Sequence, residues 1–103
     1  MNFEKYLPLT ETTFYTLMAL QEPGHGYVIM QKIEELSEGK VRTAAGTMYG
    51  AIENLIKQKL IKAVPSDDRR RKVYQITEEG KQVLILEINR IKHLIAVANR
   101  LGY

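Results

Sequence analysis

One change in the spacing of apolar residues, at about residue 60, limits the possible folds of this chain more than any other feature. Before this point apolar residues recur every three or four positions, which predicts helices over about residues 10–21, 27–37 and 45–59. After it they alternate in residues 60–64 and 71–76, which predicts two strands joined by a turn-rich segment. We therefore expect three helices followed by a single β-hairpin.

Short signals mark the ends of these elements. Thr10 can cap the first helix, and Gly39 can close the second in a left-handed conformation. Thr77 can cap a further helix that continues to about Arg100. The chain is thus expected to end in one long helix.

Three short helices, a hairpin and a final helix, in this order, predict a winged helix-turn-helix. The expected fold class is mainly α with a small β-hairpin. We expect the winged helix-turn-helix domain over residues 1–77 and a C-terminal dimerisation helix over residues 78–103. The apolar faces predicted to point into the core include Leu36 in the second helix and Ile56 in the third.

Positive charge is concentrated in the middle of the chain. Residues 40–74 carry nine basic and three acidic side chains, whereas residues 1–39 carry two basic and six acidic ones. The net charge is only +3, so the asymmetry is more informative than the total. It favours a polyanionic partner such as double-stranded DNA on one face, the alternative being an ordinary solvated surface.

Several classes of protein are not expected. The chain has no Cys, which excludes disulfide scaffolds and thiolate zinc sites and suits a reducing cytoplasm. His25 and His93 lie far apart in the sequence, so we expect no metal site, and no nucleophile–base pair or cofactor motif indicates an enzyme. No uncharged stretch is longer than residues 12–21, which are too few and too polar to span a bilayer, and we expect no signal peptide.

The start of the third helix carries the first group of candidate DNA contacts. Gly46 lets the backbone approach DNA closely, and Thr47 can donate to a phosphate or meet a thymine methyl group. The hydroxyl of Tyr49 can bond a phosphate while its ring packs on the domain. The alternative is an ordinary helix start with a half-buried tyrosine.

The hairpin tip carries the second group. Its four consecutive cations, Arg69, Arg70, Arg71 and Lys72, are suited to neutralising phosphates or entering the minor groove. The start of the second helix, at His25 and Tyr27, can offer backbone N–H groups to a phosphate. The alternative is structural: the neighbouring glycines form a bend, and Tyr27 fills the core.

The last helix has a wide apolar face. Its centre follows helical spacing through Leu84, Ile88, Ile91, Ile95 and Ala98. One small domain cannot cover so wide a face, so a second copy of the chain is expected to cover it. In a two-fold dimer, the two copies of the third helix, which would be the recognition helix that enters the major groove, would lie about 34 Å apart. The alternative is a helix folded back onto its own domain.

Four sequence blocks together resemble the PadR-type transcriptional regulators over about residues 8–84. The blocks are Pro-Gly-His-Gly-Tyr at residues 23–27, Gly-Thr-Met-Tyr-Gly-Ala-Ile-Glu-Asn-Leu at 46–55, Leu-Ile at 60–61, and Arg-Arg-Arg-Lys-Val-Tyr-Gln-Ile-Thr-Glu-Glu-Gly at 69–80. The length resembles that of the short members, which have one C-terminal helix. The resemblance implies a bacterial, cytoplasmic dimer that represses a nearby operon, and some members release DNA when a small aromatic or hydrophobic compound binds.

Two departures from the family pattern affect the candidate sites. Ala44 and Ala45 stand where many members have a small polar residue and Pro, which leaves Thr43 as the candidate cap and phosphate contact. Short drug-binding members sandwich flat ligands with Trp on the last helix, and this chain has no Trp.

The function expected is that of a repressor that binds an inverted-repeat operator as a homodimer, with release by a small hydrophobic or aromatic effector as a further expectation. One alternative is a winged-helix protein–protein interaction module that does not bind DNA. Another is a sensor whose main role is to bind a hydrophobic compound at the dimer seam.

Overall fold

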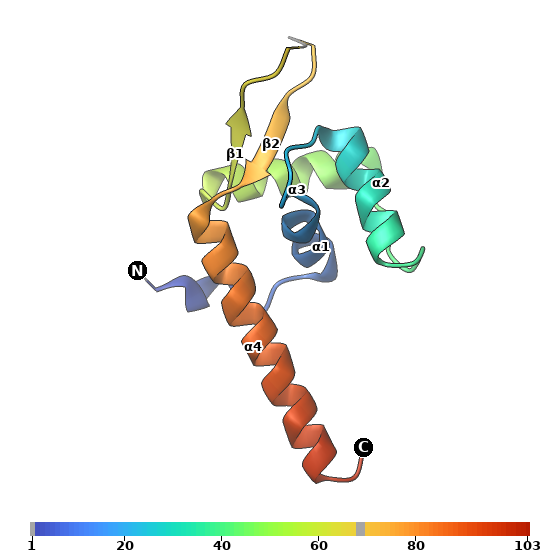
Figure 1. Ribbon diagram of the computed structural model, residues 1–103, viewed down its shortest axis with the longest axis vertical. Helices are drawn as coiled ribbons and strands as arrows, with labels where there is room; N and C mark the ends of the chain where they lie inside the picture. Colours follow the sequence, from blue (N-terminus) through green and yellow to red (C-terminus); the bar gives the residue numbers. More distant parts are fainter. Residues whose placement is uncertain (1, 68–69) are drawn as a thin grey trace.

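Three helices, a hairpin and a long fourth helix follow one another along the chain (Figure 1). The computed structural model describes residues 2–67 and 70–103. The mainly α fold class with one antiparallel hairpin, a winged helix-turn-helix, is confirmed. The elements are η1 (Phe3–Tyr6), α1 (Glu11–Ala19), α2 (Gly26–Leu36), α3 (Ala45–Lys57), β1 (Ile61–Val64), β2 (Val73–Ile76) and α4 (Glu78–Arg100).

The predicted ends of the elements hold at three places. The Thr10 side chain accepts a hydrogen bond from the Thr13 backbone N–H at 3.1 Å, which caps α1. The Thr77 side chain accepts one from the Gly80 N–H at 3.0 Å, which caps α4. Gly39 has a φ of +78°, the left-handed conformation expected after α2.

Other boundaries differ from the prediction. The short helix η1 was not expected, and α1 and α3 each end two residues early. After α3 the chain turns sharply, because Lys59 has a φ of +62° and the Leu60 N–H bonds back to the Leu55 carbonyl at 3.0 Å. This turn places Leu60 in the core. The helix therefore ends before the last apolar residue of the segment.

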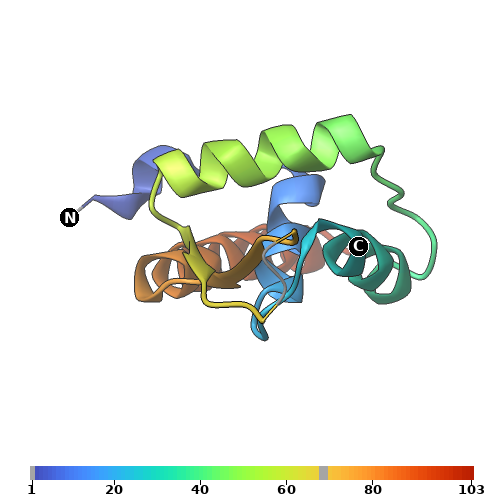
Figure 2. The same cartoon turned by 90° about the horizontal axis from the view of Figure 1, so that it is seen from above.

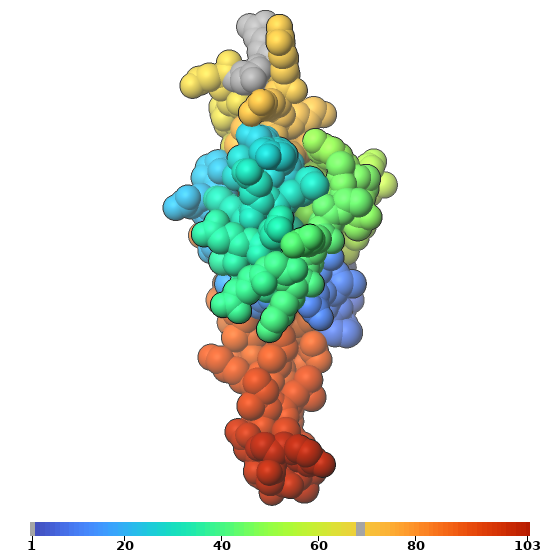
Figure 3. All heavy atoms as spheres, turned by 90° about the vertical axis from the view of Figure 1, so that its right-hand side faces the viewer, coloured from blue at the N-terminus to red at the C-terminus, as the bar shows by residue number. Residues whose placement is uncertain are grey.

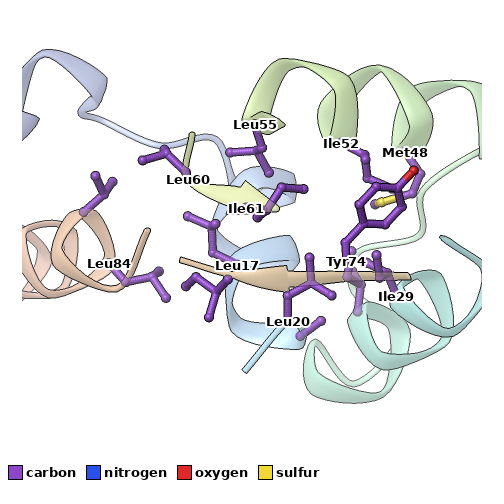
Figure 4. Close-up of a cluster of buried hydrophobic side chains, with 14 residues drawn as sticks. Leu17, Leu20, Ile29, Met48, Ile52, Leu55, Leu60, Ile61, Tyr74 and Leu84 are labelled. Atoms are coloured by element: carbon purple, nitrogen blue, oxygen red, sulfur yellow. The ribbon is translucent and has the colours of Figure 1, made fainter. Parts of the chain in front are cut away.

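The core lies between the three short helices, the hairpin and the first turns of α4 (Figure 4). Leu36 and Ile56 are exposed, so their expected places in the core are wrong. Tyr27 is 64% exposed, so the alternative in which it fills the core is wrong as well. The buried face of α2 is centred on Ile29 and Ile33, one helical turn apart, and the three-residue steps of Tyr27 and Leu36 drift away from it. The fully buried side chains are Leu17, Leu20, Ile29, Ile33, Met48, Leu55, Leu60, Ile61 and Val83, with Thr16 and Glu87.

The hairpin is fastened to the turn between α1 and α2. Gly24 and Tyr74 exchange two backbone hydrogen bonds, of 3.0 and 2.9 Å, and the Ile76 N–H donates to the Leu20 carbonyl at 3.0 Å. The strand β2 is therefore paired on one side with β1 and on the other with the α1–α2 turn. The hairpin of β1 and β2, with the segment that joins them, is called the wing below. Its base has a fixed position relative to the start of α2.

The helix α4 begins inside the domain and then leaves it (Figure 1). Leu84 is only 4% exposed, so its own chain already covers it and it does not form part of a seam with a second copy. Ile91, Leu94 and Ile95, further along, are exposed. The proposed division after Thr77 stays a prediction, with Leu84 contributing to the core of the preceding domain.

Glu87 is a buried charge on α4 that the sequence analysis did not single out. It is 1% exposed, accepts the Leu9 backbone N–H at 2.7 Å and forms an ion pair with Arg90. The hydrogen bond from Arg90 lowers the pKa of Glu87 more than burial raises it, and the bond from Leu9 lowers it further. Glu87 therefore ties the segment before α1 to the middle of α4.

None of the helices within residues 2–67 and 70–103, the long α4 included, is both long and apolar enough to cross a membrane.

Candidate nucleic-acid interface

One groove of about 480 Å³ collects predicted DNA contacts from three elements. Figure 3 shows the beginning of α2 directly below the wing. The groove is lined by His25, Gly26 and Tyr27 of α2 and its cap, Tyr49 of α3, and Arg70, Arg71, Lys72 and Tyr74 of the wing. Five residues predicted separately, Tyr27, Tyr49, Arg70, Arg71 and Lys72, thus share one surface.

The ring of Tyr49 rests on the start of α2. A Cβ atom at Gly26 would lie 3.1 Å from Cε1 and 3.2 Å from the hydroxyl oxygen of Tyr49, so glycine leaves the ring its room. Tyr49 is itself exposed and therefore reachable by a ligand. Tyr49 lines the groove, and its hydroxyl lies beside Gly26 in the first turn of α2.

The start of α2 is not capped by a side chain. His25 occupies the cap position and makes no side-chain hydrogen bond to the helix. The first N–H groups of a helix carry the positive end of its dipole, which favours an anion. The His25 ring instead faces the wing, with its Nε2 atom 3.2 Å from Nη1 of Arg71. A guanidinium can only donate, so Nε2 accepts and the proton of a neutral ring sits on Nδ1.

One phenol of the groove, that of Tyr74, has a shifted pKa. Burial raises the pKa of the Tyr74 hydroxyl, and the neighbouring Tyr49 raises it further. The hydroxyl of Tyr74 therefore stays protonated and can donate a hydrogen bond. Among the described residues that line the groove three are cations and none is acidic, so the surface attracts anions.

Gly46 and Thr47 lie outside this groove, on the first turn of α3. Both are exposed, and a Cβ atom at Gly46 would meet nothing within 4 Å, which leaves the backbone open to close approach. Figure 2 shows α3 along one side of the molecule, with its beginning near α2 and its end near the N-terminal segment. The start of α3 can therefore present backbone and hydroxyl groups to a base edge or phosphate.

Two other predicted contacts have a different outcome. Ala44, not Thr43, occupies the cap position of α3, and no side chain caps that helix. The expected cap is therefore wrong: the Thr43 hydroxyl oxygen is buried and has no hydrogen-bond partner in the part of the chain that the structure describes. Arg69 lies outside the described residues.

The sequence analysis missed Gly26 and Tyr74 as parts of the site. The signal for Gly26 was present, because two glycines flank His25 and one of them need not serve the bend. Nothing local marks Tyr74, since it reaches the groove only through its pairing with Gly24. The assembled groups are cations, phenols and helix N–H groups, which bind oxyanions and hold no carboxylate base. Within the described residues no three metal-ligating side chains cluster.

A family model described as "Transcriptional regulator PadR-like family" matches residues 16–85. No curated protein matches the chain in sequence.

Solved structures share the fold. A transcriptional regulator from Clostridium thermocellum superposes with a TM-score of 0.74 at 22% identity, over 97% of this chain and 93% of that one. A PadR family transcription regulator from Clostridium difficile R20291 superposes with a TM-score of 0.74 at 24% identity, over 89% and 98%. BpsR of Bordetella bronchiseptica, whose DNA binding is regulated by 6-hydroxynicotinic acid, superposes with a TM-score of 0.70 at 21% identity, over 92% and 66%.

Proposed function

The chain belongs to the PadR-like family of transcriptional regulators, which are DNA-binding transcription factors and not enzymes, and from this premise we propose that it is a cytoplasmic repressor that binds an inverted-repeat operator as a homodimer. The observation that carries the proposal is the groove in which Tyr27, Tyr49, Arg70, Arg71 and Lys72 meet.

The groove and the start of α3 divide the work of binding. The cations and phenols of the groove suit phosphate oxygens. Contacts to phosphates supply affinity for DNA of any sequence. The exposed first turn of α3, with Gly46 and Thr47, suits base edges in the major groove, which supply sequence preference. Because the wing is fastened to the α1–α2 turn, both parts can engage one duplex together.

The homodimer is supported by the far half of α4. Leu94 and Ile95 are 53% and 56% exposed, Ile91 is also exposed, and Ile88 and Ala98 are half-buried beside them. Covering such side chains is favourable by roughly 1.5–3 kcal/mol each. A two-fold axis through this seam would set two α3 helices about one DNA turn apart, which matches an inverted repeat.

A small hydrophobic or aromatic effector is part of the proposal. DNA binding by the similarly folded BpsR is regulated by 6-hydroxynicotinic acid. In this chain the apolar seam of α4 would be the place for an effector, because ligand sites are mostly apolar and often lie between subunits. The chain has no Trp, so the stacking partners would be Tyr103 or, from the first segment, Tyr6, Phe14 or Tyr15.

The experiment is a fluorescence-anisotropy titration of the protein on two duplexes, the region upstream of its own gene and a random sequence. We expect tighter binding to the upstream duplex. A double variant, Arg70→Ala with Arg71→Ala, should weaken binding to both and lower the slope of log K against log salt by about 0.9 for each phosphate that is no longer neutralised. The matched control is Lys40→Ala with Lys92→Ala, two exposed cations outside the groove.

The salt slope decides the outcome. A folded wing variant with the wild-type slope would place the wing away from DNA. Failure of the wild type to bind either duplex would favour the alternative, a winged-helix module that binds only proteins.

A further inference from the structure

The two edges of the hairpin differ. On the inner edge of β2, Tyr74 exchanges two backbone hydrogen bonds with Gly24, and Ile76 donates to Leu20. The outer edge belongs to β1, which stands on the outside of the hairpin in Figure 1. Within residues 2–67 and 70–103 the sheet has the order β1–β2, so no strand covers that outer edge.

The register shows which backbone groups face outward. Residues in an antiparallel pair alternate between opposed positions that exchange hydrogen bonds and positions that do not. Tyr74 faces Gly24, so its partner Ala63 lies at a position without ladder bonds. The bond from the Thr77 N–H to the Leu60 carbonyl fits the same alternation. Ile61 and Ala63 therefore direct their N–H and C=O groups away from β2. Ile61 is only 2% exposed, so the accessible backbone groups on this edge are those of Ala63.

A groove of about 560 Å³ runs beside this edge. Its apolar wall comes from three elements: Phe3 and Tyr6 of η1, Ile56 of α3, and Ile61 and Ala63 of β1. Ile56 is exposed, and the two aromatic residues are only half-buried, so apolar surface is open to a ligand here. The groove can take apolar side chains of a segment lying along β1.

The rim of the groove is basic. Lys57, Lys59 and Lys62 line it, all exposed, against the single carboxylate of Glu79. The excess of positive charge complements acidic residues in an incoming segment. Successive side chains of a strand point to opposite faces. A strand that alternates acidic and apolar residues would therefore direct its acidic side chains toward the lysines and its apolar side chains into the groove.

We propose that the outer edge of β1 binds an extended acidic segment of a partner protein, which adds to the hairpin as a third strand. Backbone hydrogen bonds to Ala63 supply affinity, and the apolar groove with its lysine rim supplies selectivity. This groove shares no residue with the groove assigned to DNA. It lies beside the end of α3 and not beside its beginning, so a regulator on DNA could hold a second protein there.

The test uses the full chain labelled with ¹⁵N and two capped synthetic peptides, Glu-Val-Glu-Val-Glu-Val and Lys-Val-Lys-Val-Lys-Val. We expect the acidic peptide to give saturable amide shifts that are largest at Ile61 and Ala63 and their neighbours. The basic peptide should bind at least about tenfold more weakly, since it meets the same backbone edge but a repulsive rim.

A variant isolates the backbone edge. Ala63→Pro removes one outward N–H and leaves the ladder to β2 intact, and Pro is tolerated in edge strands where the N–H faces solvent. It should weaken binding of the acidic peptide at least fivefold. Ala63→Val, which keeps the N–H, is the matched control, and circular dichroism confirms the fold of both.

A second pair isolates charge. Lys57→Gln with Lys62→Gln should weaken binding of the acidic peptide and leave binding of the basic peptide no weaker. Lys40→Gln with Lys92→Gln, which removes two cations outside the groove, should change neither.

Four results would each overturn the proposal: no shift at Ile61 and Ala63, equal binding of the two peptides, equal binding by the Pro and Val variants, or the same amide shifts on adding a random DNA duplex. The last would assign the lysine rim to DNA. Shifts at these amides that depend on protein concentration alone and vanish in Ala63→Pro would assign the edge to a second copy, which also overturns it. Operator binding is measured separately, so the two proposals fail independently.

Discussion

Tyr49 is the residue through which α3 contacts the start of α2 in the protein groove that we assign to DNA binding. Its ring fills the space that a side chain at Gly26 would need, which holds the hydroxyl beside the first turn of α2. Tyr49→Phe keeps the ring and removes only the hydroxyl, so we expect a loss of operator affinity on the order of 1 kcal/mol with unchanged stability. Thr47→Ala should cost a similar amount. Anisotropy titrations on the operator duplex measure both.

Asn54→Ala is the control for this pair, because Asn54 is exposed on the same helix two turns beyond Thr47. It should titrate like the wild type. If Tyr49→Phe and Thr47→Ala did so too, the start of α3 would not contact DNA through these hydroxyls.

Glu87 makes stability depend on acid pH. Its pKa in the folded chain lies below the unfolded value of about 4.3, chiefly because Arg90 donates to it. The stabilisation is thus fully present above the unfolded pKa and is lost as pH falls through the lowered pKa. Glu87→Gln cannot titrate, so it should cost on the order of 1 kcal/mol at pH 7 and progressively less toward pH 3. Urea unfolding at several pH values measures the difference.

Glu35→Gln, an exposed carboxylate on α2, is the matched control and should differ little from the wild type at any pH. A constant gap between wild type and Glu87→Gln from pH 7 to pH 3 would contradict the assignment, because a loss of packing alone does not titrate.

At the scale of elements, α4 approaches the turn before β1 very closely at Gly80. A Cβ atom at Gly80 would lie 2.2 Å from the Leu60 carbonyl oxygen and 2.7 Å from Cγ1 of Ile76. Gly80→Ala must therefore push α4 away from the hairpin, and we expect a loss of at least about 2 kcal/mol in the free energy of unfolding. Thermal or urea unfolding measures it.

Gly50→Ala tests the same substitution where there is space. Gly50 lies inside α3, and a Cβ atom there would meet nothing within 4 Å. We expect it to stabilise the fold by roughly 0.5–1 kcal/mol, since alanine favours helix over glycine. Equal effects at Gly80 and Gly50 would show that the close approach in the structure is not present in solution.

The order of elements was predictable from the sequence because it depends on local signals. Periodicity, the capping side chains of Thr10 and Thr77, and the glycine after α2 each act within a few residues. Which face of each helix is buried was less predictable. Tyr27 and Leu36 are as apolar as their neighbours, and only packing against the other helices decides that Ile29 and Ile33 are the buried pair.

The site was predictable in its charged parts and not in its assembly. A run of cations and a Gly-Thr helix start are visible in the sequence, whereas the contacts that hold the site together join distant residues. Tyr74 pairs with Gly24 across 50 residues, and Arg71 contacts His25 across 46, so no local pattern indicates either contact. Thr43 was expected to cap α3, but Ala44 occupies the cap position and the Thr43 hydroxyl is buried.

At the scale of the whole molecule, the projecting end of α4 sets the shape. The chain measures 53 × 34 × 20 Å, and the far half of α4 leaves Ile91, Leu94 and Ile95 exposed. Ile91→Asp would place a desolvated charge in the proposed seam, so we expect monomers. A monomer holds only one half-site and should lose most of the operator affinity. Sedimentation at micromolar concentration and operator titration measure the two effects.

His93→Asp puts the same charge on the opposite face of α4, where the side chain is also exposed, and should leave the dimer intact. A wild type that sediments as a monomer at micromolar concentration would remove the dimer from the proposal, together with the effector site at its seam.

The free end of α4 also makes this helix a lever. Beyond Glu87, its buried anchor, the helix continues for 13 residues to Arg100, or about 20 Å at roughly 1.5 Å per residue. A tilt of about 10° at the anchor would move the far end by about 3.5 Å, close to the rise of one base pair, about 3.4 Å. In the proposed homodimer, small changes in how Leu9, Glu87 and Arg90 hold the helix would thus shift its far end, at the proposed seam, by about the rise of one base pair.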